Sequence, residues 1–311
     1  MKVQLFVLNY NGFHYISDCI ESLVIAIKNS KHECQLTVID NESTDKSVEI
    51  IEQKFPSINL MKCKNRVLCS FNEAVKTSKA SIVFLLNNDL KVDPFFIDPL
   101  ISVFNEHENV FLAAPKSFLF DGSYEGGFSV PFMTLGTFQS TCHFQGSEKH
   151  LNELGLTFAT GFGAFDRDKF VALGGYDDLY LPGRMEDADL SLRAWKMGWK
   201  SYYEPKSIVY HLGAKSFRDR FGVRGTMEIA HRNTFLFTWK NIHDFWFLLS
   251  HFIFLLPRTT WMLLKGRYEY LTAFIKALGR LPTALQKRRK EKSIDYKLSE
   301  KQIISIFKNA H

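Results

Sequence analysis

The stretch of residues 81–89 limits the possible folds more than any other part of the chain. It reads Ser-Ile-Val-Phe-Leu-Leu-Asn-Asn-Asp, so an apolar run ends abruptly in three polar side chains. Such a run is typical of a strand that is buried on both faces in a parallel sheet. The polar triplet then lies at the carboxyl end of the strand, where open α/β sheets bind ligands. A carboxylate beside two amides suits a divalent cation that carries phosphate oxygens, although Asn-Asn-Asp is also ordinary turn chemistry.

Strands and helices alternate through the first third of the chain. Runs typical of strands occur at residues 3–8, 35–39, 58–61, 81–86 and 110–114. Apolar spacing, caps and proline positions predict helices at residues 13–28, 44–55, 70–77 and 94–106. This alternation predicts βαβ units and a mainly parallel sheet.

The next part of the chain is less regular. Residues 120–157 are rich in Gly, Ser, Thr and Phe, which is typical of loops or irregular antiparallel strands. Short helices are predicted at residues 165–173 and 186–197, because glycine follows each of them. A last strand is predicted at residues 207–210.

Composition indicates a globular protein with reduced cysteines. The chain has 311 residues, of which 46% are hydrophobic, so it can bury a large core. Its five cysteines include no CxxC pair, which favours buried, reduced thiols in a cytosolic protein. Met1 and Lys2 lead straight into an apolar run that we interpret as a first strand and not as a signal peptide.

The carboxyl-terminal part combines aromatic, apolar and basic residues. Residues 258–311 hold 13 Lys and Arg against 4 Asp and Glu. The apolar run at residues 245–256 has twelve residues, which is too short to span a bilayer, and residues 261–275 continue as an aromatic, basic stretch. The basic excess suggests an anionic partner, either a membrane or a nucleic acid, of which the nucleic acid is less favoured. The coincidence of aromatic and basic residues predicts a helical hairpin that lies on an anionic membrane without crossing it. A helical lid with a solvated basic tail is the alternative.

Polar segments follow the first two predicted strands. Residues 8–12 read Leu-Asn-Tyr-Asn-Gly, and residues 40–45 read Asp-Asn-Glu-Ser-Thr-Asp. Tyr10 can stack on a base, and Asp40 can accept a hydrogen bond from a base imide or a ribose hydroxyl. Either segment alone is more typical of ordinary turns and caps. The chain has neither GxGxxG nor GxxxxGK[ST], which disfavours an NAD site and P-loop chemistry.

An acidic segment opens the helix predicted at residues 186–197. Carboxylates in a first helical turn are stabilised as anions, and an ionised carboxylate is what a general base requires. Helix capping alone would explain one of the three acidic residues, Glu186, Asp187 and Asp189. Asp189 lies four residues before Arg193, which marks it as the structural member. His211 follows the last predicted strand and can complete a metal shell of Asp, His and phosphate.

Taken together and in this order, these motifs resemble those of the family 2 glycosyltransferases of the GT-A fold, in particular the bacterial rhamnosyltransferase-like branch. The resemblance covers about residues 1–215 and is carried by residues 7–12, 38–47, 84–89, 161–165, 174–177, 186–193 and 209–211. It implies an α/β GT-A domain, a nucleotide-sugar donor, Mn²⁺ or Mg²⁺, and inversion at the anomeric carbon. We expect this domain at residues 1–235 and a helical, membrane-associating extension at residues 236–311.

The resemblance also implies roles for individual residues. Asp89 and His211 match metal ligands, and Asp187 matches the base that deprotonates the acceptor hydroxyl, with Glu186 as the neighbouring alternative. The donor-binding candidates are Leu8, Asn9, Tyr10, Asp40, Arg66, Asn87 and Asn88. Residues 65–72 lack the glycines common at this place in the family, and Arg66 is included because it can contribute a charge to the diphosphate instead. Asn87 stands where the DxD motif has its first Asp, so Asp89 is the one carboxylate of that motif.

We expect an enzyme that extends a lipid-linked or cell-surface glycan from the cytoplasmic face of the inner membrane, as a peripheral protein. Inverting transfer needs one base on the attacking side and one cation on the leaving group, without a covalent nucleophile. A sugar-1-phosphate nucleotidyltransferase is one alternative, but the loop after the first strand has no Lys or Arg. A non-catalytic glycan-binding protein is another, against which the acidic and histidine candidates argue.

Overall fold

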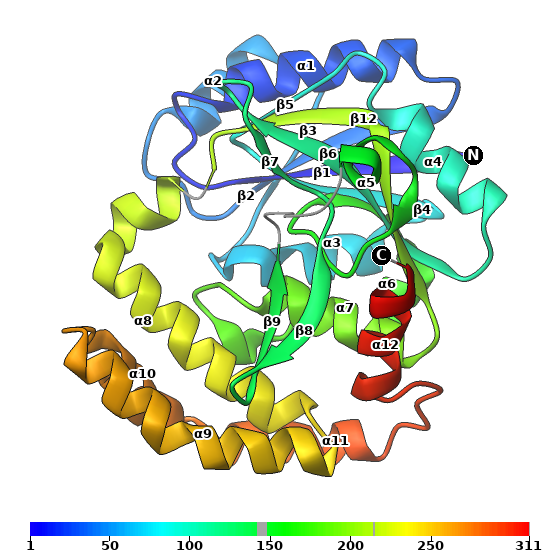
Figure 1. Cartoon of the computed structure of the whole chain (residues 1–311). Coiled ribbons are helices and arrows are strands. Elements are labelled where there is room, and N and C mark those ends of the chain that lie inside the picture. Colours follow the sequence, from blue (N-terminus) through cyan, green and yellow to red (C-terminus); the bar gives the residue numbers. More distant parts are fainter. Residues whose placement is uncertain (142–147, 214, 311) are drawn as a thin grey trace. The chain divides into compact units, whose positions relative to one another are not determined.

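The computed structural model describes residues 1–141, 148–213 and 215–310, and it forms two compact units (Figure 1). The first unit comprises Met1–Ser129, Cys142–Tyr176 and Trp199–Gly213. The second comprises Val130–Thr141, Asp177–Gly198 and Ala214–His311. The boundary predicted at residue 235 falls within the second unit, in the part of α8 (Lys215–Asn241) that follows a kink at Gly222.

The first unit is built on one mixed sheet. Its order is β10-β12-β6-β11-β4-β1-β2-β3, with β5 paired to β12 and β7 paired to β6. The strands are β1 (Lys2–Asn9), β2 (Glu33–Asp40), β3 (Asn59–Lys62), β4 (Ile82–Asn87), β5 (Leu90–Val92), β6 (Val110–Leu119), β7 (Tyr124–Gly126), β10 (Gly155–Leu156), β11 (Gly163–Asp166) and β12 (Lys200–His211). The run β4-β1-β2-β3 is parallel throughout, and β6 is parallel to β12, which confirms the predicted α/β class.

Helices cover both faces of this sheet. They are α1 (Ile16–Asn29), α2 (Ser47–Lys54), α3 (Phe71–Thr77), α4 (Ile97–Glu106), α5 (Glu148–Asn152), α6 (Arg167–Ala172) and the 3₁₀ helix η1 (Val67–Ser70). Figure 1 shows α1 and α4 on one face of the sheet and α3 and α6 on the other.

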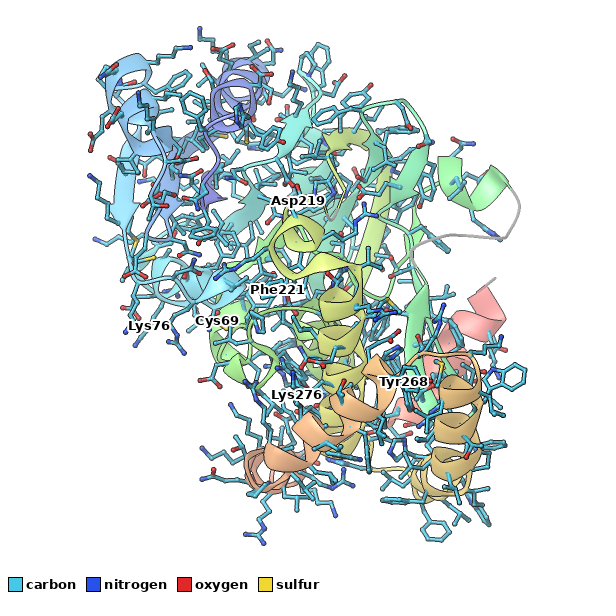
Figure 2. The ribbon with its side chains drawn as sticks, turned by 90° about the vertical axis from the view of Figure 1, so that its left-hand side faces the viewer. Cys69, Lys76, Asp219, Phe221, Tyr268 and Lys276 are labelled. Atoms are coloured by element: carbon cyan, nitrogen blue, oxygen red, sulfur yellow. The ribbon has the colours of Figure 1, made fainter. Side chains whose placement is uncertain are left out.

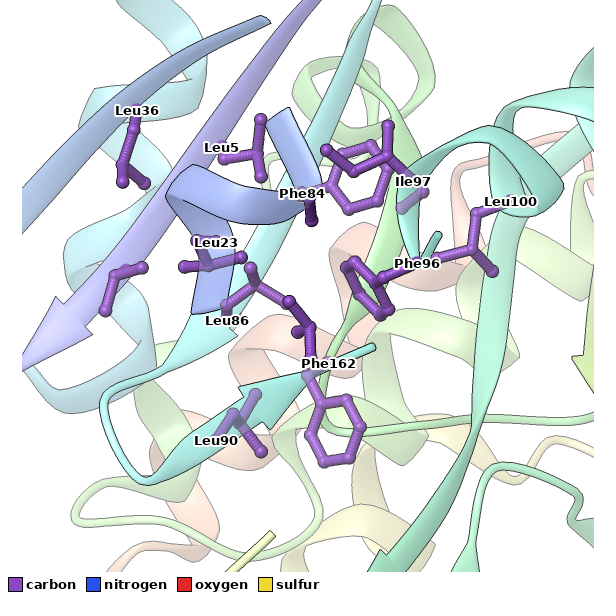
Figure 3. Close-up of a cluster of buried hydrophobic side chains, with 14 of the residues drawn as sticks. Leu5, Leu23, Leu36, Phe84, Leu86, Leu90, Phe96, Ile97, Leu100 and Phe162 are labelled. Atoms are coloured by element: carbon purple, nitrogen blue, oxygen red, sulfur yellow. The ribbon is translucent and has the colours of Figure 1, made fainter. Parts of the chain in front are cut away.

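The core confirms the first prediction from the sequence. All five residues of β4 from Ile82 to Leu86 are buried, as a central parallel strand requires. Leu23 of α1 and Phe96 just before α4 pack with Leu5 and Phe84 of the sheet (Figure 3). Burial of each such side chain contributes about 1.5–3 kcal/mol. The sheet edge that carries Asn87 is therefore rigidly placed.

Several predicted boundaries were wrong. β6 continues five residues beyond Ala114, and β12 has twelve residues where four were predicted. The residues predicted to begin a helix at Phe165 belong to β11, because Ala164 and Phe165 are buried between β4 and β6. β5 was not predicted at all. In each case pairing with distant strands overrides the local pattern.

The cysteines agree with the prediction of reduced thiols. Cys19 and Cys69 are buried, Cys34 and Cys63 are half-buried, and all four are free. Burial raises the pKa of the Cys19 thiol to about 12, which makes it inert. Cys142 lies outside the described residues.

The second unit is mainly helical. Its elements are the hairpin β8 (Val130–Thr134) and β9 (Thr137–Thr141), the 3₁₀ helix η2 (Asp178–Tyr180), and the helices α7 (Glu186–Lys196), α8, α9 (Phe245–Leu264), α10 (Glu269–Gly279), α11 (Leu281–Lys292) and α12 (Glu300–Ala310). Both α10 and α11 pack against α8.

The length predicted for the apolar segment was wrong. Residues 245–256 form the first part of α9, which has 20 residues because the helix continues through Pro257 to Leu264. By length and composition alone, α9 is long and apolar enough to cross a membrane. The length of α9 therefore does not exclude a bilayer-spanning helix.

Candidate active site

The carboxyl ends of β1, β2 and β4 meet at one edge of the first unit. Parallel register places Asn9 beside Asp40 and Leu8 beside Asn87. The buried Asn9 amide donates to Asp40 Oδ1 at 2.9 Å, and Asn88 Nδ2 donates to Asn9 Oδ1 at 2.9 Å. Leu8 is buried as well. Asn9 therefore joins the ends of three strands, and the sequence reasoning, which treated it as a donor contact, did not identify this role.

Tyr10 and Asp40 lie at neighbouring strand ends, as predicted, but in different settings. The Tyr10 side chain is 38% exposed, so its ring is accessible for stacking. Asp40 is 4% exposed, and its Oδ2 accepts a hydrogen bond from the Ser43 backbone N–H at 3.2 Å. Gly12 is required behind them, because a Cβ there would lie 2.2 Å from Asn88 Nδ2. The edge thus combines an exposed ring with a fixed carboxylate.

Asp89 and His211 are brought together by strand β5, which the sequence did not reveal. β5 begins directly after Asp89 and pairs antiparallel with the end of β12, so that His211 lies opposite Leu90. This register places His211 Nε2 3.3 Å from Asp89 Oδ1. Asp89 is buried, and its Oδ1 has no hydrogen bond from any described residue. The oxygen has the His211 imidazole as an ion-pair partner but no hydrogen bond, so it fits a cation ligand.

Glu125 of β7 is a further member of this cluster. His211 Nδ1 lies 2.7 Å from Glu125 Oε1, and Ser117 Oγ donates to Glu125 Oε2 at 2.6 Å. Burial lowers the pKa of His211, but Asp89 and Glu125 outweigh it and raise that pKa to about 9. A carboxylate behind a histidine is the arrangement that orients metal-ligating imidazoles. No sequence signal marked Glu125, because pairing of β7 with β6 alone brings it here.

The cluster fits a metal ion that is shared with a ligand. Among residues 1–141, 148–213 and 215–310, no group of three or more His, Cys, Asp and Glu side chains is arranged to hold a metal alone. Asp89 offers one carboxylate oxygen, and His211 offers one imidazole nitrogen once metal binding displaces its proton. Mg²⁺ is commonly bound by one or two carboxylates together with substrate phosphates, and Mn²⁺ accepts similar ligands. The residues present therefore suit a cation that phosphate oxygens help to hold.

Arg66 lies in the loop before η1. Its side chain is exposed, and its backbone N–H donates to Ser70 Oγ at 3.2 Å. The next residue, Val67, has a left-handed backbone with φ of 51°, and its carbonyl accepts a hydrogen bond from Asn41 Nδ2 at 3.3 Å. The loop is thereby tied to the end of β2, beside Asp40.

Glu186 and Asp187 belong to the second unit, in the first turn of α7. The two residues before them, Arg184 and Met185, both have left-handed backbones, with φ of 73° and 75°. Burial and the charge of Asp187 raise the pKa of Glu186 to about 8, and burial raises the pKa of Asp187 as well. Asp187 Oδ1 accepts a hydrogen bond from the Ala188 N–H at 2.8 Å. By contrast, Glu186 Oε2 accepts no hydrogen bond from any described residue. The Ala188 N–H therefore favours the ionised form of Asp187.

Asn233 of α8 supports the strained turn before α7. Its side-chain amide donates to the carbonyls of Tyr180, Gly183 and Arg184 at 2.6, 2.7 and 2.9 Å. Asn233 is fully buried, and these backbone carbonyls satisfy its side-chain amide within the protein. The sequence gave no reason to connect a residue in α8 with the start of α7.

Asp189 is the structural member of the acidic segment, as predicted. It is fully buried and pairs with Arg193 Nε at 2.9 Å. Lys240 Nζ and the Tyr180 hydroxyl each lie 2.7 Å from its Oδ1. Burial raises the pKa of Asp189, but the charges of Lys240 and Arg193 outweigh it and hold that pKa far below its usual range.

A comparison of the sequence with known families decides the class of protein. The profile of Glycosyl transferase family 2 matches residues 5–172, which is more than half of the chain. The chain belongs to this family. The match includes β1, β2 and β4, whose ends carry the donor-site candidates of this glycosyltransferase.

Individual relatives agree with this assignment. The glycosyltransferase is 23% identical over 266 residues to N-acetylglucosaminyl-diphospho-decaprenol L-rhamnosyltransferase of Mycobacterium tuberculosis, covering 77% of this chain and 84% of that protein. It resembles S. aureus TarS 1–349 in complex with UDP-GlcNAc, with a TM-score of 0.57, 18% identity, and coverage of 91% of this chain and 81% of that chain. It also resembles GalNAc-T7 with UDP, GalNAc and Mn²⁺, with a TM-score of 0.54, 17% identity, and coverage of 68% of this chain and 44% of that chain. These likenesses confirm the predicted GT-A fold.

Proposed function

We propose that this glycosyltransferase moves a sugar, with inversion, from a nucleoside-diphosphate sugar to a hydroxyl of a lipid-linked or cell-surface glycan. The observation that carries the proposal is the pairing of Asp89 with His211 at a sheet edge that also presents Tyr10 and Asp40. A relative named for rhamnosyl transfer to a diphospho-decaprenol glycan supports the acceptor class. A solved neighbour in complex with UDP-GlcNAc supports the donor class.

In this proposal the first unit holds the donor. Tyr10 stacks on the base, and Asp40 accepts a hydrogen bond from the nucleoside. Asp89 and His211 are the two protein ligands of Mn²⁺ or Mg²⁺, and Arg66 adds positive charge near the diphosphate. When bound, the cation neutralises charge that develops on the diphosphate leaving group.

Asp187 is the proposed base. The acceptor oxygen forms a bond to the anomeric carbon while the bond from that carbon to the diphosphate oxygen breaks. The hydroxyl proton passes to the Asp187 carboxylate, and the electron pair of the broken bond leaves with the diphosphate. We favour Asp187 over Glu186 because the pKa of Glu186 is raised to about 8, which keeps it protonated near neutral pH.

Measurements of donor binding and of sugar transfer test separate parts of this proposal. Calorimetric titration with nucleoside diphosphates and Mn²⁺ should show binding that Asp89→Asn weakens. Asp187→Asn should retain this binding and lose at least about 10²-fold in transfer rate. Asp168→Asn is the matched control, because its side chain is 84% exposed.

The stereochemistry of the product gives an independent result. NMR of the first-formed glycoside should show an anomeric configuration opposite to that of the donor. Retention of configuration would contradict the inverting mechanism. Full transfer activity in both Asp89→Asn and Asp187→Asn would refute the assignment of the site.

A further inference from the structure

One side of α9 exposes an unusual number of large apolar residues. Its exposed large apolar residues, here called the α9 face, are Phe245, Trp246, Leu249, Phe252, Ile253, Phe254, Leu256, Trp261 and Leu264, with exposed fractions between 37% and 80%. Many of them recur at helical spacing along one stripe. Tyr268, Leu271 and Ile275 continue the exposed apolar surface from the turn after α9 into α10, and Tyr268 is labelled in Figure 2. Soluble monomers rarely leave such a continuous patch uncovered.

The opposite side of α9 is held by polar contacts within the second unit. The Trp239 indole N–H donates to His251 Nε2 at 3.2 Å, so the proton of the imidazole is on Nδ1. That N–H donates to the Gly136 carbonyl at 2.8 Å, in the turn between β8 and β9. Arg258 donates to the Leu135 carbonyl in the same turn. α9 is therefore attached to this turn at His251 and Arg258, and to α8 at His251.

These contacts bear on whether α9 crosses a bilayer. In the hydrocarbon core every backbone polar group needs an internal partner, and irregular loops exposed to lipid do not occur there. A crossing α9 would carry the turn at Leu135 and Gly136, with Arg258, to membrane depth. Leu135 is 58% exposed, on the same turn. The structure thus leaves the α9 face available to lipid and holds the helix on protein at His251 and Arg258.

We propose that the α9 face lies in the headgroup and upper acyl region of an anionic membrane, with α9 parallel to the surface. Residues 245–264 contain no Asp or Glu, so nothing on this helix repels anionic lipid. Lys265 and Arg267 are exposed at the turn that ends α9, and Lys265 lies over the Trp261 ring at 4.4 Å from its centroid. Trp246 near the start and Trp261 near the end of α9 suit the polar–apolar boundary, where tryptophan is enriched.

A bilayer fits this surface better than a second copy of the chain. Two copies that met through this face would bring the exposed cations Lys265 and Arg267 of each copy into the same interface. Anionic headgroups instead meet these cations while the aromatic side chains enter the acyl boundary. The proposal rests on the composition and exposure of this face and does not require the proposed glycosyl transfer.

Flotation with lipid vesicles tests the proposal on the full chain. The wild type should float with vesicles of phosphatidylcholine and phosphatidylglycerol, and less with phosphatidylcholine alone. The triple variant Phe252→Ser, Ile253→Ser and Leu256→Ser should lose at least a hundredfold in vesicle affinity. These side chains are 61%, 58% and 74% exposed, so folding does not depend on them. Phe95→Ser is the matched control, because that ring is 68% exposed outside the α9 face.

Further experiments distinguish binding parallel to the membrane surface from a bilayer-spanning helix and from a dimer. Lys265→Glu with Arg267→Glu should reduce binding to the anionic vesicles alone. Alkaline carbonate should extract the wild type from vesicles, and resistance to extraction would overturn the parallel orientation. A wild type that stays unbound at low salt would overturn the membrane proposal. The membrane proposal would also be overturned if light scattering showed the wild type as a dimer and the triple variant as a monomer. Transfer to a soluble acceptor reports on the proposed function separately and should be unchanged in the triple variant.

Discussion

Removing the Lys240 charge should destabilise the second unit strongly. Lys240 is 1% exposed, and its Nζ lies 2.7 Å from both Asp177 Oδ2 and Asp189 Oδ1. Lys240→Met keeps most of the side-chain volume but leaves Asp189 with Arg193 as its one remaining cation. Removal of one partner from a buried ion pair costs about 3–5 kcal/mol, because a buried charge is left uncompensated.

The expected loss depends on pH. The charge of Lys240 outweighs the burial that raises the pKa values of Asp177 and Asp189, and it holds both below the ordinary value. Carboxyls with lowered pKa values stabilise the folded state above their unfolded pKa of about 4, and this stabilisation is lost as pH falls further. The difference between wild type and Lys240→Met should therefore be full at pH 7 and shrink below about pH 4.

Urea denaturation followed by tryptophan fluorescence measures this difference. Lys62→Met is the matched control, because Lys62 forms a 2.9 Å ion pair with Glu52 in which both side chains are more than half exposed. That surface pair should contribute about 0–1 kcal/mol. Adding Asp189→Asn to Lys240→Met should restore part of the lost stability. The reasoning is refuted if Lys240→Met costs no more than Lys62→Met at pH 7.

Three further predictions concern individual residues. Glu125→Gln should weaken Mn²⁺ binding by about 10–100-fold in calorimetry, because the carboxylate orients His211, and unchanged affinity would exclude this role. Gly136→Ala should lower the melting temperature more than Gly122→Ala. Both have positive φ, but only at Gly136 would a Cβ meet backbone atoms of α9, the closest at 2.4 Å; equal shifts would contradict this packing. Glu186→Gln should raise the melting temperature more at pH 8 than at pH 5. The pKa of Glu186 rises to about 8 on folding, so this carboxyl destabilises the folded protein increasingly as pH rises from about 4.5 towards 8. A change in melting temperature that is the same at both pH values would argue against the raised pKa.

Local patterns were enough to predict the parallel part of the sheet. The apolar run that ends at Leu86 identified β4, and strand alternation identified β1 and β2. Since parallel strands place their carboxyl ends at one edge, Asn9, Asp40 and Asn87 could be expected together, and they are. The spacing of Asp189 and Arg193 likewise predicted a contact that depends on helix geometry alone.

Contacts between distant segments could not be predicted in this way. Glu125 contacts His211 because β7 pairs with β6, and neither segment has a pattern that identifies its partner. Asn233 and Lys240 reach the start of α7 from α8, across about 50 residues of sequence. The length of α9 was also missed, because the sequence offered a proline as a stop where the helix continues.

The sequence by itself therefore determined the family, the order of strands and helices in the first third, and the residue types at the strand ends. Each follows from short-range periodicity or from a motif within a few residues. Tertiary structure alone decided which side chains meet at the strand ends, which carboxyl groups have raised pKa values, and which residues of α9 contact the rest of the protein. These depend on strand register, burial and the charges of segments far apart in the chain, none of which a local pattern specifies.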